Sequence, residues 1–179
     1  TIQEIRKDFT LLNNLKQAAK TMNFLTEHGI SSYGELESKL NAVSARRDTA
    51  HAEIKRIESR SAELALVMKH AGTYRQLKPL YDRYRKSNDK EKFLRGHESE
   101  IILFEAAARE LKRLGAVPLP TTESMKTELA NLNAEKERLL AEYKAARTEA
   151  QEYETVKQNV DALLTVPKEQ EQQRRHELE

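Results

Sequence analysis

Cysteine and tryptophan are absent from this chain of 179 residues, and glycine and proline occur only 5 and 4 times. The lack of cysteine excludes disulfides and zinc–thiolate sites, and it fits a reducing compartment. No apolar run approaches the ~18–20 residues that cross a membrane, and the opening residues lack the pattern of a signal peptide. We therefore expect a cytoplasmic protein with no membrane partner.

Aromatic residues make up only 6% of the chain, whereas charged residues make up 34% and hydrophobic residues 38%. So few large side chains leave little material for a thick globular core. The same balance suits long, exposed helices that each carry a narrow apolar stripe. The composition therefore predicts an all-α fold.

The two ends of the chain indicate a fragment. The chain opens within a helical pattern at Thr1-Ile2, without an initiator methionine, and it ends in Leu178-Glu179. Such a terminal pair is typical of residues that cloning leaves before a purification tag. We expect the chain to be a piece excised from a longer protein.

Two helices are expected in the first 71 residues. In the first, over residues 2–28, apolar side chains recur at steps of three and four, and Gly29 ends the helix. These side chains are Ile2, Ile5, Phe9, Leu12, Leu15, Ala19, Met22 and Leu25. The second helix begins at Ser32, because Ser32 and Glu35 form a capping box. It carries a heptad stripe that is typical of a coiled coil, with Leu36, Leu40, Val43, Arg47, Ala50, Ile54, Ile57, Ser61, Leu64, Met68 and Ala71.

Residues 72–120 are expected to form a helical tip. Gly72 and Pro79 predict a kink or break, followed by a short helix over residues 73–86 and a turn and cap at residues 87–89. A helix over residues 90–114 follows, and Gly115 closes it. Its wide apolar stripe predicts the best-buried part of the chain, with Phe93, Leu94, Ile101, Ile102, Leu103, Phe104, Ala108 and Leu111.

The last long helix is expected to begin at Thr121 or Thr122, with Thr122 as the cap, and to end at Pro167. Its stripe consists of Met125, Leu129, Leu132, Lys136, Leu139, Tyr143, Ala146, Ala150, Tyr153, Lys157, Val160 and Leu164. The polar residues that stand in the two long stripes, Arg47, Ser61, Lys136 and Lys157, either set the register or extend their charged ends to solvent.

The two long stripes have nearly equal lengths and predict an antiparallel coiled coil with a helical hairpin at its tip. Residues 31–87 hold 12 basic and 7 acidic side chains (net +5), whereas residues 121–179 hold 9 and 13 (net −4), and opposite charges favour this pairing. The expected organisation is an N-terminal helix (1–30), two coiled-coil helices (31–71 and 121–165), a tip (72–120) and a polar tail (166–179). The alternative is an elongated helical bundle in which residues 32–87 form one continuous helix.

The sequence lacks the patterns of catalytic chemistry. The five histidines, at positions 28, 51, 70, 97 and 176, do not share a helix face at metal-ligand spacing. A glycine-rich phosphate loop and a nucleophile–base pair are also missing. We therefore expect no catalytic residue, no metal site and no cofactor in this chain, and we expect that it is not an enzyme by itself.

One cluster stands out between residues 69 and 95, where nine basic side chains face only three acidic ones (net +6). Basic groups neutralise phosphates and aromatic faces stack on unpaired bases, and Tyr74, Tyr81, Tyr84 and Phe93 interleave with the cluster. In the alternative interpretation the charges form a solvated face and the aromatics a buried stripe. The candidate DNA-binding residues are Lys69, Arg75, Lys78, Arg83, Arg85, Lys86, Lys90, Lys92 and Arg95.

Four stretches resemble the C-terminal helical region of relaxases, the mobilisation nucleases of conjugative elements (plasmids or conjugative transposons) in gut Firmicutes. The similarity covers the chain from about residue 14 to residue 164 and depends on the order and spacing of the stretches. They are residues 14–21 (NLKQAAKT), 25–33 (LTEHGISSY), 81–86 (YDRYRK) with 91–93 (EKF) and 98–103 (ESEIIL), and 142–147 (EYKAAR) with 156–161 (VKQNVD).

The resemblance implies a bacterial parent enzyme that nicks one DNA strand at an origin of transfer. In such relaxases an N-terminal domain supplies a tyrosine nucleophile and a metal held by histidines. No stretch here matches that motif, so no catalytic residue is carried over. The implied role is to assist DNA binding, with single-stranded DNA as one candidate partner, and to assist relaxosome assembly. The alternative role is a coiled-coil spacer or docking module for the coupling protein or other transfer proteins, and a homodimer through the coiled coil is a further possibility.

Overall fold

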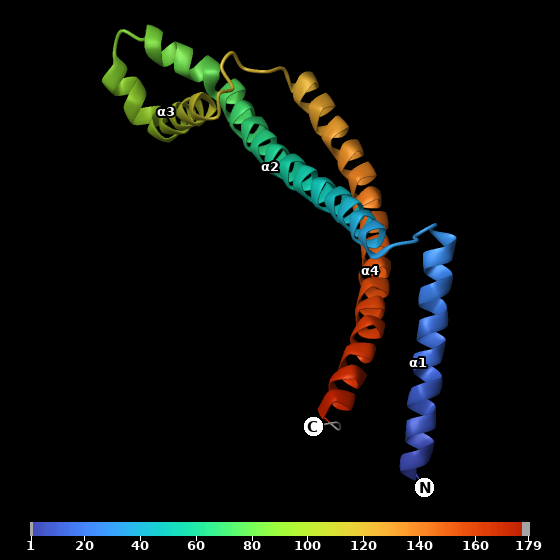
Figure 1. The fold of residues 1–179 in the computed structure, drawn as a ribbon. Coiled ribbons are helices and arrows are strands. Elements are labelled where there is room, and N and C mark those ends of the chain that lie inside the picture. Colours follow the sequence, from blue (N-terminus) through green and yellow to red (C-terminus); the bar gives the residue numbers. More distant parts are fainter. Residues whose placement is uncertain (1, 177–179) are drawn as a thin grey trace. The chain divides into compact units, whose positions relative to one another are not determined.

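The computed structural model describes residues 2–176, in which the chain forms four helices and no strand. The helices are α1 (Ile2–Glu27), α2 (Tyr33–Lys86), α3 (Lys90–Arg113) and α4 (Thr122–His176) (Figure 1). The predicted all-α fold is therefore confirmed. Among the described residues, no helix is both long enough and apolar enough to cross a membrane. The terminal pair Leu178-Glu179 lies outside the described part of the chain.

The helices pack into two compact units, to each of which both α2 and α4 contribute. Unit 1 comprises Thr1–His51 and Ala141–Glu179, and unit 2 comprises Ala52–Leu140. In each unit α2 and α4 run antiparallel, because residue numbers that rise along α2 meet numbers that fall along α4. The pairs in contact are Tyr33–Asp161 and Arg46–Glu149 in unit 1, and Glu58–Lys136 and Arg60–Glu128 in unit 2.

The two heptad stripes predicted from the sequence pack against each other, and we call this packing the seam. Every position of the α2 stripe is buried or half-buried, and so is every position of the α4 stripe except Leu164. In unit 1 the core includes Leu36, Val43, Ala150, Tyr153 and Val156. In unit 2 it includes Leu64, Val67, Ala71, Leu111, Ala116 and Met125, so α3 and the segment after it complete the core.

The basic side chains within the seam extend to its edges and pair with acidic groups. The Lys136 ammonium lies 2.7 Å from a Glu58 carboxylate oxygen of α2. Arg47 lies 2.9 Å from its neighbour Asp48 and 3.8 Å from Glu154 of α4. Their alkyl chains therefore cover the apolar core while their charges remain hydrated and paired.

Helix α1 packs on α4 within unit 1 through one face only. Asn159 donates a hydrogen bond of 3.1 Å to the hydroxyl of Thr21, which is buried, and Phe24 packs edge-on against Tyr153. The opposite face of α1 is exposed. The stripe predicted there includes Leu12, Leu15 and Met22, which are 53%, 60% and 59% exposed.

The ends of the helices follow local sequence signals. Gly29 and Gly115 follow α1 and α3 with φ of 61° and 68°, a left-handed conformation that closes a helix and is unfavourable for other residues. Ser32 accepts a hydrogen bond from the Glu35 amide (3.2 Å), as the capping box predicts, although the Glu35 carboxylate bonds Ser31 instead of Ser32. The cap of α4 is Thr121, which bonds the Ser124 amide (3.1 Å), so the prediction of Thr122 was wrong.

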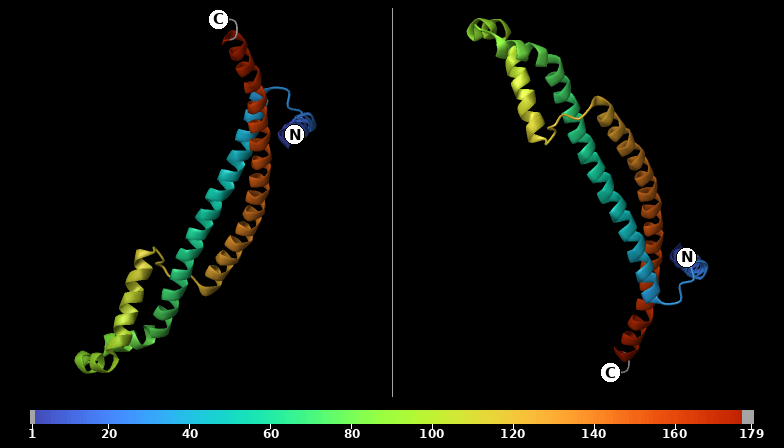
Figure 2. Two further views of the ribbon diagram at one scale, coloured as in Figure 1. Left: turned by 90° about the horizontal axis from the view of Figure 1, so that it is seen from below. Right: turned by 90° about the horizontal axis from the view of Figure 1, so that it is seen from above.

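Three further expectations were wrong. Helix α2 continues through Gly72 and Pro79 to Lys86 as one helix, so the separate short helix expected over residues 73–86 was wrong and the alternative of one continuous helix holds. The helix bends in its last part (Figure 2), which agrees with the expected kink, because a proline removes one backbone hydrogen bond. Helix α4 continues through Pro167 to His176. The third helix is buried on one face only, because Ile102 and Leu103 are more than half exposed.

Candidate nucleic-acid interface

The nine basic residues predicted to bind DNA lie on the last part of α2 and the first part of α3, and all nine are exposed. A turn at residues 87–89 joins the two helices, and α3 folds back beside the end of α2 (Figure 1). Hydrogen bonds order this turn: the Asp89 amide donates to the Ser87 hydroxyl (3.2 Å), and the Asp89 carboxylate accepts from the Lys92 amide (3.0 Å). The fold therefore places Arg83, Arg85, Lys86, Lys90 and Lys92 around one turn, whereas Lys69 and Arg75 lie farther back on α2.

Three of the nine already interact with other groups of the chain. Arg75 donates hydrogen bonds to the Thr122 hydroxyl (2.8 Å) and to the Pro120 carbonyl, so it holds the segment that leads into α4. Lys78 is bonded to Asp82 (2.9 Å). Arg95 lies 3.7 Å from Glu91, although both side chains are mostly exposed.

Five basic residues around the turn remain available, and we call them the tip cations. No ion pair involves any of them within the described part of the chain. Lys69 is also unpaired there, but it lies farther back on α2. The tip cations are Arg83, Arg85, Lys86, Lys90 and Lys92.

Helix stability explains only some of these charges. Arg83, Arg85 and Lys86 lie in the last turn of α2, where positive charge favours the negative end of the helix dipole. Lys90 and Lys92 lie at the other kind of end, at the start of α3, where positive charge opposes the dipole. The helix dipole therefore does not account for these two lysines.

The aromatic residues that interleave with the cluster pack between α2 and α3. Tyr74 and Tyr81 both stack on Phe104, with ring centroids 4.8 and 4.2 Å apart. Tyr84 makes a tilted contact with Phe93 at 6.1 Å. Each of the interleaved rings is therefore half-buried and contacts at least one other ring of unit 2, which agrees in part with the buried stripe of the alternative interpretation. Sequence reasoning missed the contribution of Phe104, although Tyr74 and Tyr81 stand one heptad apart and so predict a common partner.

The hydroxyl end of Tyr81 is also engaged. It donates a hydrogen bond of 3.4 Å to the Glu105 carboxylate, and burial, together with the Glu105 charge, raises the pKa of Tyr81. This tyrosine therefore stays neutral in the physiological pH range. It contributes packing to the site and no charge.

Three histidines, His28, His51 and His97, pack against aromatic rings. Among the described residues, no group of three or more histidine, aspartate or glutamate side chains is arranged to hold a metal ion. His97 interrupts the regular backbone of α3 (φ −140°, ψ 25°). The His28–Phe24 and His51–Tyr143 pairs are stacked, with ring centroids 3.9 and 5.5 Å apart, and the His97–Phe93 pair is tilted, with centroids 4.8 Å apart.

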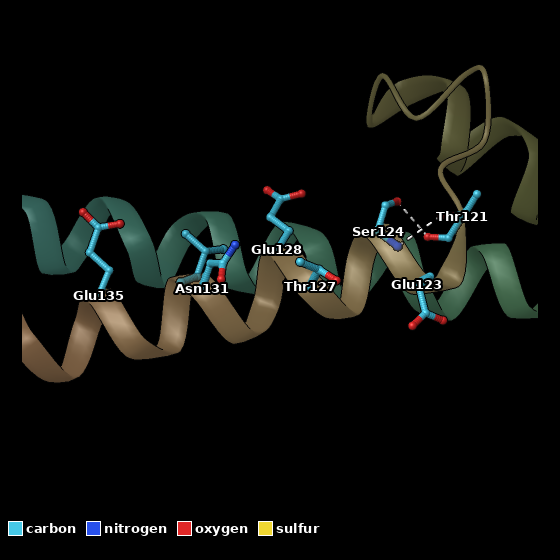
Figure 3. Close-up of a pocket in the computed structure, with 8 residues that line it drawn as sticks. Thr121, Glu123, Ser124, Thr127, Glu128, Asn131 and Glu135 are labelled. Atoms are coloured by element: carbon cyan, nitrogen blue, oxygen red, sulfur yellow. Dashed lines mark hydrogen bonds between the residues drawn. The ribbon is translucent and has the colours of Figure 1, made fainter.

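A shallow groove on the first turns of α4 is the acidic counterpart of the tip. Figure 3 shows its polar lining, in which Ser124 bonds Thr121 at the start of the helix. Glu123, Glu128 and Glu135 lie along it, and Glu128 is paired with Arg60 of α2. Because carboxylates repel phosphates, this groove does not extend the basic surface.

The exposed cations at the tip can bind anions by charge and by hydrogen bonding. No family model, no curated protein and no solved structure matches the chain. The function of the site therefore has to be inferred from its own chemistry.

Proposed function

We propose that this chain is a non-catalytic helical region of a DNA relaxase, in which the tip cations help to hold DNA and to assemble the relaxosome. One observation carries the proposal: five exposed cations surround an ordered turn, and none forms an ion pair within the described residues. Surfaces of this kind bind phosphates by releasing counterions. The choice of DNA and of a relaxase comes from the resemblance of the sequence alone.

DNA binding by the purified chain across a salt series tests the proposal. We expect labelled DNA to bind at low salt, with log K falling linearly as log salt rises from about 50 to 200 mM. A variant with Arg83→Glu, Lys86→Glu, Lys90→Glu and Lys92→Glu should bind at least about tenfold more weakly and with a smaller salt slope, because phosphate contacts are lost. In the parent relaxase the same variant should lower transfer frequency without abolishing nicking.

A matched control separates the tip from the total charge of the chain. Reversing four exposed cations elsewhere changes the net charge by the same amount. We choose Lys55, Lys126, Lys144 and Arg147, which are exposed on α2 and α4. Equal losses in both variants would assign the effect to net charge, and unchanged binding by the tip variant would make the tip a solvated face.

A second candidate function is a spacer or docking module for another transfer protein, without DNA contact. The heptad stripes of α2 and α4 are occupied by each other, so the stripe that remains open is the exposed one on α1, with Leu12, Leu15, Ala19 and Met22. A heptad stripe favours another helix as its partner. That helix belongs to a coupling protein, to another relaxosome subunit or to a second copy of this chain.

The docking proposal is tested by Leu12→Asp combined with Leu15→Asp. In a pull-down from a conjugative donor, the wild-type chain should recover a transfer protein and the variant should not. Sedimentation of the purified chain checks the homodimer, which the same variant should dissociate. If the variant supports transfer at the wild-type frequency, the stripe is not a docking surface.

A further inference from the structure

The tip cations are exposed to solvent, whereas the neighbouring aromatic rings are half-buried. Tyr74 and Tyr81 stack on Phe104 through their faces, with interplanar angles of 26° and 23°. Tyr84 lies between Tyr81 (5.9 Å) and Phe93 (6.1 Å). These contacts and the half-burial of the rings reduce the aromatic surface on which a base could stack.

Proteins that prefer single-stranded nucleic acid combine cations with aromatic faces on which the unpaired bases stack. At the tip the cations are exposed, whereas the aromatic rings are half-buried in the packing of α2 against α3. The binding energy of the tip should therefore come mainly from phosphate contacts, and the nucleic acid with the densest phosphates should bind most tightly. Duplex DNA carries one negative charge per ~1.7 Å of its axis, and its bases need no stacking partner from the protein.

The acidic groups of this region are also committed to other partners and leave the tip cations unneutralised. Asp82 pairs with Lys78, Asp89 caps α3, and Glu91 faces Arg95. The turn between the helices is ordered by the hydrogen bonds of Ser87 and Asp89. The cations are therefore displayed from a pre-ordered support, which reduces the entropy lost on binding.

From these features we infer that the tip binds the phosphate backbone of double-stranded DNA and does not recognise unpaired bases. The inference rests on the proposed function and makes it more specific. It assigns the tip to the duplex beside a nick and not to the released strand. It also implies that binding has no sequence preference, because phosphate contacts carry no sequence information.

Three probes of equal length test this inference with the wild-type chain: a duplex, one of its single strands, and an abasic strand with the same number of phosphates. We expect the duplex to bind at least about threefold more tightly than either strand and with the steeper salt slope. The single strand and the abasic strand should bind alike. Tighter binding of the single strand than of both other probes would overturn the inference but leave the proposed function standing.

Two variants of the protein test the same inference with the same three probes. Tyr84→Leu keeps an apolar side chain in the α2–α3 packing, and it should leave affinity for the duplex and for the single strand within about twofold of wild type. Lys86→Gln with Lys90→Gln should weaken all three probes together. A loss confined to the single strand in Tyr84→Leu, with circular dichroism unchanged, would overturn the inference. Failure of the wild-type chain to bind any probe would instead reject the proposed function.

Discussion

Charged residues serve different purposes at the seam and at the tip. At the seam, cations of one helix face anions of the other, as in Arg60–Glu128 (2.7 Å) and Arg46–Glu149 (3.3 Å). At the tip, cations from two consecutive helices surround one turn, and the nearby acidic groups are already paired. The number of charges in a region therefore does not reveal their role. The position of the opposite charge decides whether a cation stabilises the fold or stays available to a ligand.

The largest effect on stability is expected at the seam itself. Ile54→Lys places a charge at a position that is 6% exposed, and it should lower the free energy of unfolding by about 2–4 kcal/mol, the cost of losing a core aliphatic side chain and burying an unpaired charge. Urea unfolding followed by circular dichroism measures it. Ala52→Lys, at an exposed position of the same helix, is the control and should change little. Equal stability of the two variants would show that Ile54 does not support the seam.

A smaller effect is expected where α1 joins α4. Thr21→Val keeps the shape of the side chain but leaves the Asn159 amide without its acceptor, so unfolding should become easier by about 1–3 kcal/mol. Thr26→Val removes only a bond to the carbonyl of Met22 within α1 and should have a smaller effect. If both variants lose the same free energy of unfolding, the hydrogen bond between Asn159 and Thr21 contributes nothing beyond the effect of valine on helix propensity.

The pH dependence of unit 1 is expected to be modest and to have a defined direction. Tyr33 donates a hydrogen bond of 2.7 Å to Asp161, and this bond, followed by Lys157, lowers the pKa of Asp161. The resulting stability is present above the ordinary aspartate pKa of about 3.9 and is lost as pH falls through the lowered folded value. Tyr33→Phe should raise the Asp161 pKa in an NMR titration, whereas Tyr143→Phe should leave it unchanged.

Lys157 belongs to the same network, and its contribution to stability changes at alkaline pH. Tyr33 and Asp161 raise the pKa of Lys157 to about 12. Because the folded pKa is raised, this contribution is complete below the ordinary lysine pKa of about 10.4 and is lost as pH rises through about 12. Across this alkaline range the free energy of unfolding should fall less in Tyr33→Phe than in wild type. The same loss in both would exclude Tyr33 from the network.

The smallest effect on stability is expected at the tip. The four charge reversals at Arg83, Lys86, Lys90 and Lys92 should shift Tm by less than about 3 °C, because exposed charges contribute little to stability. Differential scanning calorimetry provides the measurement. A larger shift would mean that these charges support the fold after all, and it would remove the contrast between the tip and the seam.

Much of the fold was predictable because its signals are local. Residues that stand a heptad apart share a helix face, so the stripes of α2 and α4 identified the buried positions before any packing was known. Gly29 and Gly115 predicted the helix ends, because few other residues adopt the positive φ found there. Helix α2 bends without breaking near Pro79, and α4 does not end at Pro167, because a proline removes one hydrogen bond and does not by itself outweigh a long helix.

The candidate site was predictable only in part. The excess of basic residues between Lys69 and Arg95 was visible in the sequence, but which of them stay unpaired was not. Arg75 is engaged by a carbonyl and a hydroxyl more than forty residues away in the chain, and no local rule anticipates such a partner. Phe104 joins the rings of α2 for the same reason, since the turn at residues 87–89 folds α3 back onto α2.

The sequence by itself determined the all-α fold, the two stripes that pair α2 with α4, and the charge of the tip, because helix periodicity, capping and net charge depend on residues close together in the chain. Tertiary structure alone decided that Leu12, Leu15 and Met22 of α1 stay exposed and that the tyrosines of the tip are half-buried against α3. It also decided that the five tip cations remain without acidic partners. These outcomes depend on which helix face meets which neighbour, and that choice is made by packing between segments far apart in sequence.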